Sequence, residues 1–158
     1  MGSTVWIEVR GRDLKQTVSD SNALNRVGDE LDKLAGQLGV FALSHFYDWS
    51  EMDAAAEAEM CLIEGRPVPD HLKFRNITKQ PADQRATVGT WFDSTEGLHS
   101  VQAIGLLLVK DPQAVFLPTG SRDIERYHRN LVRELKHCED VLLTAVNSGQ
   151  PFGLLIVP

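Results

Sequence analysis

The stretch of sequence that decides the fold is Phe152 to Val157 (FGLLIV), which is apolar at every position apart from one glycine. A strand with no polar face is typical of a sheet that is covered on both sides, or of pairing near the middle of a sheet. At the other end of the chain, Thr4 to Arg10 (TVWIEVR) is rich in β-branched residues and also predicts a strand. Its Val5, Ile7 and Val9 alternate and would share one face. We expect these two terminal strands to pair in a small sheet.

Between these strands, the spacing of apolar residues predicts four helices, each bounded by residues typical of helix ends. They cover Asp20 or Ser21 to Leu38, Ser50 to Glu64, Asp93 to Asp111, and Ser121 or Asp123 to Asn147. Capping patterns open two of them, at Ser50 with Asp53 and at Asp93 with Glu96. The residues expected to face the core include Leu24, Val27, Leu31, Leu34 and Leu38 in the first helix, Met52, Ala55, Ala56 and Ile63 in the second, Leu98, Val101, Ile104, Leu107 and Leu108 in the third, and Ile124, Tyr127, Leu131, Leu135, Cys138, Leu142 and Ala145 in the fourth.

The remaining segments are less regular. Val40 to Trp49 (VFALSHFYDW) holds four aromatic residues and fits either a strand or an aromatic-rich loop. We expect short strands near Leu72 to Ile77 and Thr87 to Phe92, because a structureless connection over residues 65 to 90 would be unusual in a compact domain. Strands at both ends with about four helices between them predict an α+β or α/β fold. With 158 residues the chain is long enough for one hydrophobic core, so we expect a single domain over residues 1–158.

The charge of the chain is concentrated in one segment. Asp48 to Glu64 (DWSEMDAAAEAEMCLIE) holds six of the 22 acidic residues and no Lys or Arg. The other 16 acidic residues are balanced by the 16 basic residues of the chain, so the net charge of −6 belongs formally to this segment. A concentrated field of one sign steers partners of the opposite charge.

Composition argues against several functions. An acidic chain is not drawn as a whole to nucleic acid or to anionic lipid. Its apolar runs are too short to span a membrane, and its first residues lack the pattern of a signal peptide. Cys61 and Cys138 lie beside apolar neighbours and predict buried thiols instead of a disulfide framework. We therefore expect a cytoplasmic protein that binds neither nucleic acid nor membranes.

The sequence contains no motif specific for a cofactor. Glu96 with His99 and Glu134 with His137 share the Glu-x-x-His spacing of carboxylate-bridged metal sites. Helical spacing turns both histidines away from the apolar side of their helices, so these pairs would not meet in a shared core. The glycines fit neither nucleotide-binding fingerprint. We expect no cofactor, no metal and no catalytic site.

The acidic segment is the candidate binding site. The residues predicted to contact a partner are Tyr47, Asp48, Trp49, Glu51, Asp53, Glu57 and Glu64. Aromatic side chains beside carboxylates are typical of protein-binding hot spots, where aromatics supply contact area and charges supply recognition. A row of basic residues on the last predicted helix provides a counterpart, in the same molecule or in a second one: Arg122, Arg126, Arg129, Arg133 and Lys136.

Three functions fit these features. The preferred one is a non-enzymatic binding protein whose acidic helix and adjacent aromatics engage a basic protein partner. Small inhibitor or immunity proteins share this size and charge, although no motif supports the likeness. The first alternative is a small hydrolase-type enzyme with an acid-lined pocket, in which Glu59 or Asp93 would work. The second is a structural homodimer in which the basic helix of one copy meets the acidic helix of the other. Neutralisation of the acidic helix by the arginine row within one subunit would remove the reason for an external partner.

Overall fold

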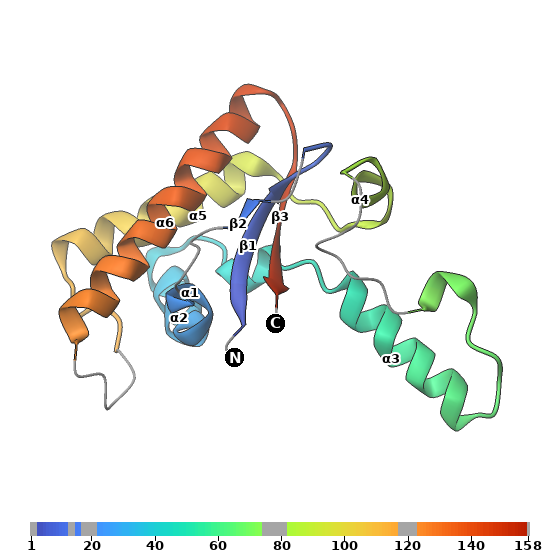
Figure 1. Ribbon diagram of the computed structural model, residues 1–158. Coiled ribbons are helices and arrows are strands. Elements are labelled where there is room, and N and C mark those ends of the chain that lie inside the picture. The colour runs from blue at the N-terminus through green and yellow to red at the C-terminus, as the bar shows by residue number, and fades with distance from the viewer. Residues whose placement is uncertain (1–2, 13–14, 17–21, 74–81, 117–122, 158) are drawn as a thin grey trace.

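An antiparallel sheet joins the two ends of the chain at the centre of the computed structural model, which describes residues 3–12, 15–16, 22–73, 82–116 and 123–157 (Figure 1). β1 (Thr4–Val9) pairs along its whole length with β3 (Phe152–Val157). The two-residue β2 (Lys15–Gln16) lies on the other side of β1, so the strand order is β2-β1-β3. The predicted pairing of the terminal strands is confirmed, and its antiparallel direction makes the fold α+β.

The far edge of β3 is closed by two short backbone contacts. The N–H of Asp48 donates to the carbonyl of Leu154 at 2.8 Å, beside a bridge between Tyr47 and Leu154. Phe92 and Phe152 exchange two backbone hydrogen bonds, of 2.8 and 3.1 Å. β3 is therefore held from both sides, although only β1 forms a full strand against it.

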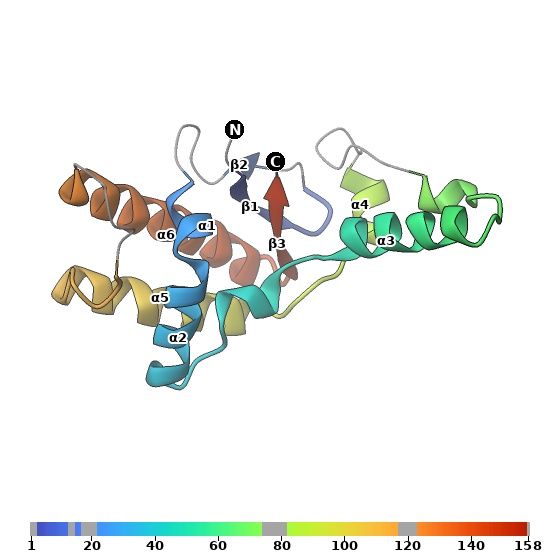
Figure 2. The ribbon, with the colours of Figure 1, turned by 90° about the horizontal axis from the view of Figure 1, so that it is seen from below.

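The helices form one thick layer and one outlying arm. The described helices are α1 (Ala23–Arg26), α2 (Gly28–Leu38), α3 (Ser50–Ile63), α4 (Ala82–Val88), α5 (Ser94–Lys110) and α6 (Ile124–Asn147), with 3-10 turns η1 (Leu43–Phe46) and η2 (Asp70–Leu72). α5 and α6 run side by side with α1 and α2 close to them, whereas α3 points away beyond the sheet (Figures 1 and 2). The four predicted helices are present, and α4 is an addition to them.

The core lies between the sheet and the layer of α1, α2, α5 and α6. Buried apolar side chains come from each of these elements, among them Val5, Ile7, Leu31, Ile104, Leu131, Leu135, Leu142 and Leu154. On β3 both Leu154 and its neighbour Leu155 are buried. The prediction that this strand is covered on both faces is confirmed.

The first predicted helix is interrupted at Val27, whose φ of −115° and ψ of 19° are not helical. Four of the five side chains predicted to face the core are buried, but Leu38 is 38% exposed because α2 has passed the core at its last turn. Gly39 then ends α2 in the left-handed conformation, with φ of 70°. The predicted caps at Asp20 and Ser21 lie outside the described residues.

The middle of the chain contains less strand than predicted. The strand at Thr87 to Phe92 is wrong, because α4 continues to Val88 and only Phe92 bridges to β3. Of the predicted strand from Leu72 to Ile77, Leu72 belongs to η2 and residues 74–77 lie outside the described residues. Val40 to Trp49 is the aromatic loop, with η1 inside it. Helix α4 places Arg85 against two buried carboxylates, and no local sequence pattern reveals that interaction.

Helix caps agree with the sequence in part. Asp93 caps α5 by accepting the N–H groups of Thr95 and Glu96, at 2.8 and 3.0 Å. Asp123 caps α6 by accepting the N–H of Arg126 at 2.8 Å. Ile124 is nevertheless 61% exposed, because the first turn of α6 lies beyond the core. The cap at Ser50 is wrong: Ser50 is the first helical residue of α3, and its N–H donates to the preceding Asp48 side chain.

Candidate functional site

Helix α3 stands away from the body of the molecule as an arm, which we define as α3 together with η2. Both ribbon views show α3 beyond the sheet, on the side opposite α5 and α6 (Figures 1 and 2). Of its 14 residues only Cys61 is buried. η2 packs against it. Helices of globular proteins usually bury an apolar face, so the exposure of α3 requires its own explanation.

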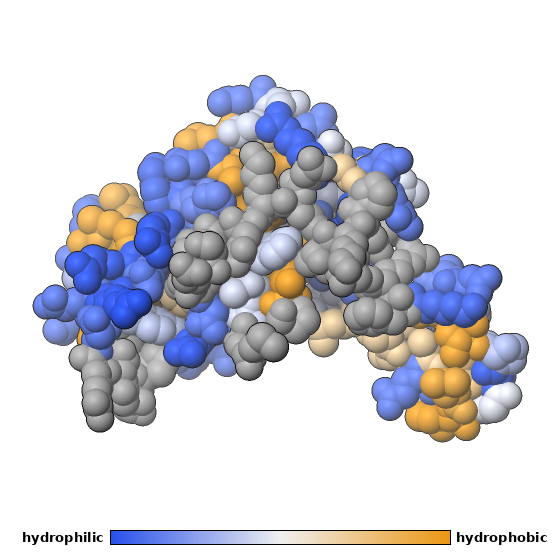
Figure 3. Space-filling model, viewed as in Figure 1, coloured by the Kyte–Doolittle hydropathy of each residue, from blue (hydrophilic) through white to orange (hydrophobic). Residues whose placement is uncertain are grey.

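An apolar stripe runs along the exposed side of α3. Met52, Ala56, Met60 and Ile63 recur at helical spacing and share one side of the helix, and we define them as the arm stripe. Met52 is 61%, Met60 50% and Ile63 70% exposed. Figure 3 shows apolar surface on the arm at the lower right of the view. The prediction that this side, with Ala55, faces the core is wrong, because α3 leaves the core instead of packing on it.

Carboxylates flank the arm stripe. Helical spacing places Asp53, Glu57 and Glu64 along one edge and Glu59 along the other, and all four side chains are exposed. Glu64 pairs with Arg66, at 2.5 Å, within the same part of the chain. Among the described residues no ion pair joins α3 to α6, which lies across the sheet. The arginine row of α6 therefore does not neutralise the described carboxylates of the arm.

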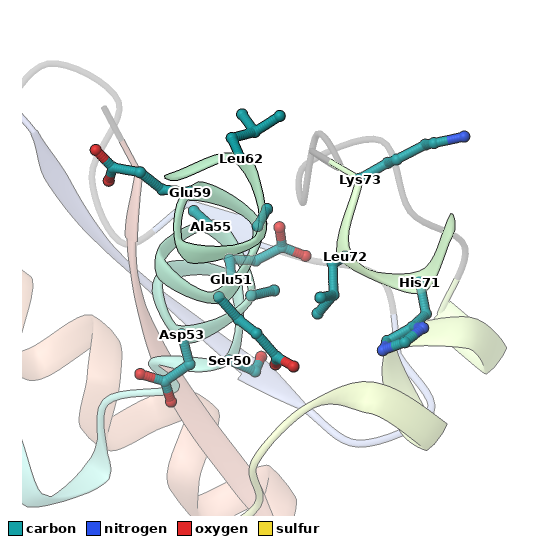
Figure 4. A pocket seen from close by; sticks show the side chains of 12 residues that line it. Ser50, Glu51, Asp53, Ala55, Glu59, Leu62, His71, Leu72 and Lys73 are labelled. Carbon is teal, nitrogen blue, oxygen red and sulfur yellow. The ribbon is translucent and has the colours of Figure 1, made fainter. Parts of the chain in front are cut away.

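A groove of about 610 Å³ lies between α3 and η2 (Figure 4). Ala54, Ala58 and the buried Leu72 are among its lining residues, and Glu51 lines it as well. Small alanine side chains let η2 lie close to this side of α3, while the arm stripe stays open. The carboxylates in the groove are largely open to solvent. Asp93, one of the two acids considered for hydrolase chemistry, is engaged in capping α5.

A buried ionic cluster anchors the base of the arm. Arg85 Nη2 donates to Glu8 Oε1 at 2.5 Å and to Asp48 Oδ2 at 2.7 Å, and all three side chains are almost fully buried. Asp48 Oδ1 also accepts the N–H of Ser50 at 3.0 Å. The cluster thus links β1, α4 and the first residue of α3. Asp48, which was predicted to contact a partner, lies inside the molecule in this cluster.

The two carboxylates of the cluster differ in their ionisation. Burial raises the pKa of Glu8, and its contacts with Arg85 offset this only in part. Burial acts on the pKa of Asp48 in the same direction, but hydrogen bonds from Ser50 and Arg85 outweigh it and leave this pKa lowered. Burial alone would lower the pKa of Arg85, but its hydrogen bonds to both carboxylates raise it. Arg85 thus offers one positive charge to two buried carboxylates, and burial outweighs the favourable contacts at Glu8 but not at Asp48.

Two predicted aromatic contacts lie on either side of Asp48. Tyr47 and Trp49 pack edge to face, with ring centroids 5.4 Å apart. Tyr47 is half-buried, and burial followed by the charge of Asp32 raises the pKa of its hydroxyl. Trp49 is 39% exposed. Of the two rings, Trp49 is the one that presents surface beside the arm.

Sequence reasoning did not single out Glu8 or Arg85, and it treated Glu134 only as half of a metal-like pattern. Glu8 alternates with apolar residues on β1, a position typical of a side chain that faces solvent. Only the approach of α4, from a distant part of the chain, buries it. Glu134 lies inside the core and accepts the N–H groups of Ala23 and Leu24, at 3.2 and 2.8 Å. Its carboxylate caps α1, and its position between core residues of α6 was the one available signal.

No cluster of three or more His, Cys, Asp or Glu side chains suited to a metal occurs in the described ranges. Cys61 and Cys138 are both buried free thiols, as predicted. Within the described residues, no helix is long and apolar enough to cross a bilayer. Comparison with family models, curated proteins and solved structures finds no match for the chain.

Proposed function

We propose that the protein is a non-enzymatic binding protein and that the arm is its docking element. The arm stripe enters an apolar surface of a protein partner, and the flanking carboxylates meet basic side chains around that surface. The observation that carries the proposal is the exposed arm stripe on a helix that stands off the body. Apolar anchors every three or four residues along a helix are typical of helix-in-groove recognition.

Energetics support a docking role. Burying a large apolar side chain contributes about 1.5–3 kcal/mol, and the three large side chains of the arm stripe are all at least half exposed. A partner that covers them recovers this contribution. Carboxylates at the rim add recognition of basic partners and faster association. The buried cluster at the base of the arm holds the start of α3 in place, which lowers the entropic cost of docking.

A small inhibitor or immunity protein would use such an arm by covering a basic site on its target. In that case the target presents an apolar patch rimmed by Lys or Arg. Trp49 would lie at the margin of the contact, since it is exposed at the base of the arm.

The test is quantitative capture of binding partners by the immobilised protein. Asp53→Asn, Glu57→Gln and Glu64→Gln together remove three charges from one edge of the arm stripe. We expect this variant to retain about a tenth or less of the captured partner at low salt, because rim charges govern association and its salt dependence. Circular dichroism verifies that the variant is folded.

A matched control removes the same charge elsewhere, at three exposed residues far from the arm in sequence: Asp29→Asn, Glu96→Gln and Glu125→Gln. This control should capture its partner as the parent does. A second variant, Met52→Ser with Ile63→Ser, should lose capture at low and high salt alike, because it removes apolar anchors. Equal capture by the parent and both arm variants would overturn the proposal.

A further inference from the structure

We infer that the surface which receives the arm belongs to a second copy of this chain, where it is the groove between α5 and α6. This inference rests on the proposed docking role of the arm. It identifies the partner from the chemistry of the molecule itself.

The receiving groove is built from two adjoining hollows of about 440 and 610 Å³. Both are lined by Val109, Val132 and Lys136, so they form one continuous groove. Leu106 and Val109 on its α5 side are 60% and 63% exposed. At Gly105, a Cβ atom would meet no other atom within 4 Å, which shows that the groove is open there.

Basic side chains lie along the α6 side of this groove. Arg129 and Arg133 are exposed, line the groove and have no carboxylate partner among the described residues. Lys136 differs, because it pairs with Glu139 at 3.0 Å and with Asp140 at 3.3 Å on its own helix. Asp140 also lines the larger hollow and Glu139 the smaller one. The larger hollow therefore holds three basic side chains against one acidic one and is net positive, whereas Lys136 and Glu139 balance each other in the smaller one.

Arm and groove are complementary in both properties. The arm offers an apolar stripe with carboxylates at its edges, and the groove offers an apolar floor with arginines at its edge. Within one molecule they lie on opposite sides of the sheet (Figures 1 and 2). A chain in this conformation therefore cannot fill its own groove, whereas a second copy brings the two surfaces together.

Two copies related by a two-fold axis would make this contact twice, with each arm in the groove of the other copy. The arrangement covers exposed apolar side chains of both α3 and α5. Contiguous apolar surface of this kind is usually covered in a stable protein. Every arm and every groove is used once, so the assembly closes as a dimer.

The test uses charge reversal on each side, with oligomeric state measured by light scattering and sedimentation. The arm variant is Asp53→Lys with Glu57→Lys, and the groove variant is Arg129→Glu with Arg133→Glu. Each variant alone places like charges in both contacts. We expect the parent to dimerise and each variant to dimerise at least about a hundredfold more weakly, because like-charge juxtaposition disfavours association strongly.

Mixing the two variants is the decisive step. In the mixed dimer the basic arm of one chain meets the acidic groove of the other, and the second contact keeps its original charges. Dimer formation should therefore return on mixing. Asp29→Lys with Glu125→Lys, which reverses two exposed acids outside both surfaces, should dimerise like the parent. Gly105→Leu fills the groove without changing charge and should also weaken the dimer.

A monomeric parent, dimers unaffected by either reversal, or mixed variants that stay monomeric would each overturn the second-copy inference. Failure of the second-copy inference can be distinguished from failure of the proposed docking function. If the arm variants still lose capture of a different basic protein, the docking role stands and its partner is that protein. If arm substitutions change neither self-association nor capture, the docking role fails as well.

Discussion

Replacing Arg85 by Met tests whether the buried ionic cluster holds the base of the arm. The substitution keeps much of the side-chain volume but leaves Glu8 and Asp48 buried without their shared cation. Breaking a buried ion pair from one side costs about 3–5 kcal/mol. A domain of this size loses about 2–4 °C in Tm per kcal/mol, so we expect Tm to fall by about 6–20 °C.

Urea unfolding followed by circular dichroism measures the cost, and Arg66→Met is the matched control. Arg66 pairs with Glu64, but both side chains are about half exposed. An exposed pair contributes about 0–1 kcal/mol, so the control should be nearly neutral. Removing all three buried charges, with Glu8→Gln and Asp48→Asn added to Arg85→Met, should restore much of the stability, since no uncompensated charge remains.

The same cluster makes stability depend on pH with opposite signs at its two carboxylates. The pKa of Glu8 lies above its ordinary value of 4.5, so its stabilising contribution is present at lower pH and is lost as the pH rises through the folded value. The pKa of Asp48 lies below its ordinary value of 3.8, so its contribution is present at higher pH and is lost as the pH falls through the folded value. At about pH 7 both carboxyl groups are ionised in an unfolded chain. At that pH, Glu8→Gln should therefore leave the free energy of unfolding almost unchanged or raise it, whereas Asp48→Asn should lower it.

Either of two results would show that the cluster does not hold the base of the arm. One is a loss of less than about 1 kcal/mol in the free energy of unfolding for Arg85→Met, which is the value expected for an exposed ion pair. The other is a triple variant as unstable as the single one, which would mean that packing and not charge dominates. Equal effects of Glu8→Gln and Asp48→Asn at pH 7 would contradict the opposite directions of the two pKa shifts.

Three further predictions concern the two glycines of α5 and the two cysteines. Gly105→Ala should stabilise the protein by up to about 1 kcal/mol, because a Cβ there meets nothing within 4 Å and alanine favours a helix. Gly97→Ala should instead destabilise by about 1–3 kcal/mol in urea unfolding, because its Cβ would lie 2.2 Å from the ring of Phe152, and equal shifts for the two variants would contradict this packing. Burial, followed by the nearby charge of Glu134, raises the pKa of Cys138 to about 12. In single-cysteine variants, thiol labelling of Cys138 should therefore require global unfolding, whereas labelling of Cys61 on the arm should be about tenfold faster or more. Equal labelling rates would show that the arm does not open separately from the core.

Strands and long helices were predictable because their signals are local. Alternation in β1, the apolar run of β3 and the capping aspartates Asp93 and Asp123 all act within a few residues of themselves. The break at Val27 was not predictable in this way. Glu134, more than a hundred residues away in sequence, supplies acceptors for the N–H groups at the start of α1 and so helps to fix where that short helix begins.

The sequence indicated the carboxylates and aromatics of the candidate site, but it assigned the apolar stripe of α3 to the core and did not single out Met60. Helical spacing correctly placed Met52 and Ile63 on one side of α3 and the carboxylates Asp53, Glu57 and Glu64 along another. An apolar stripe of this kind fits a core-facing helix and a docking helix equally well. Only the tertiary arrangement, in which α3 extends beyond the sheet, distinguishes the two. Asp48 is the opposite case. Its place in an acidic run indicated an exposed residue, but its side chain is buried in a hydrogen bond with Arg85.

The exposure of α3 follows from the small size of the sheet. β1 and β3 have six residues each, and α1, α2, α5 and α6 already supply the core on one face. The other face is closed in part by Arg85 of α4 against Glu8. Little apolar sheet surface remains for another helix, so α3 projects with its stripe uncovered. The ionic cluster then ties the first residue of α3 to β1 and α4. Weakening the cluster should therefore reduce docking by the arm even at temperatures where the core stays folded.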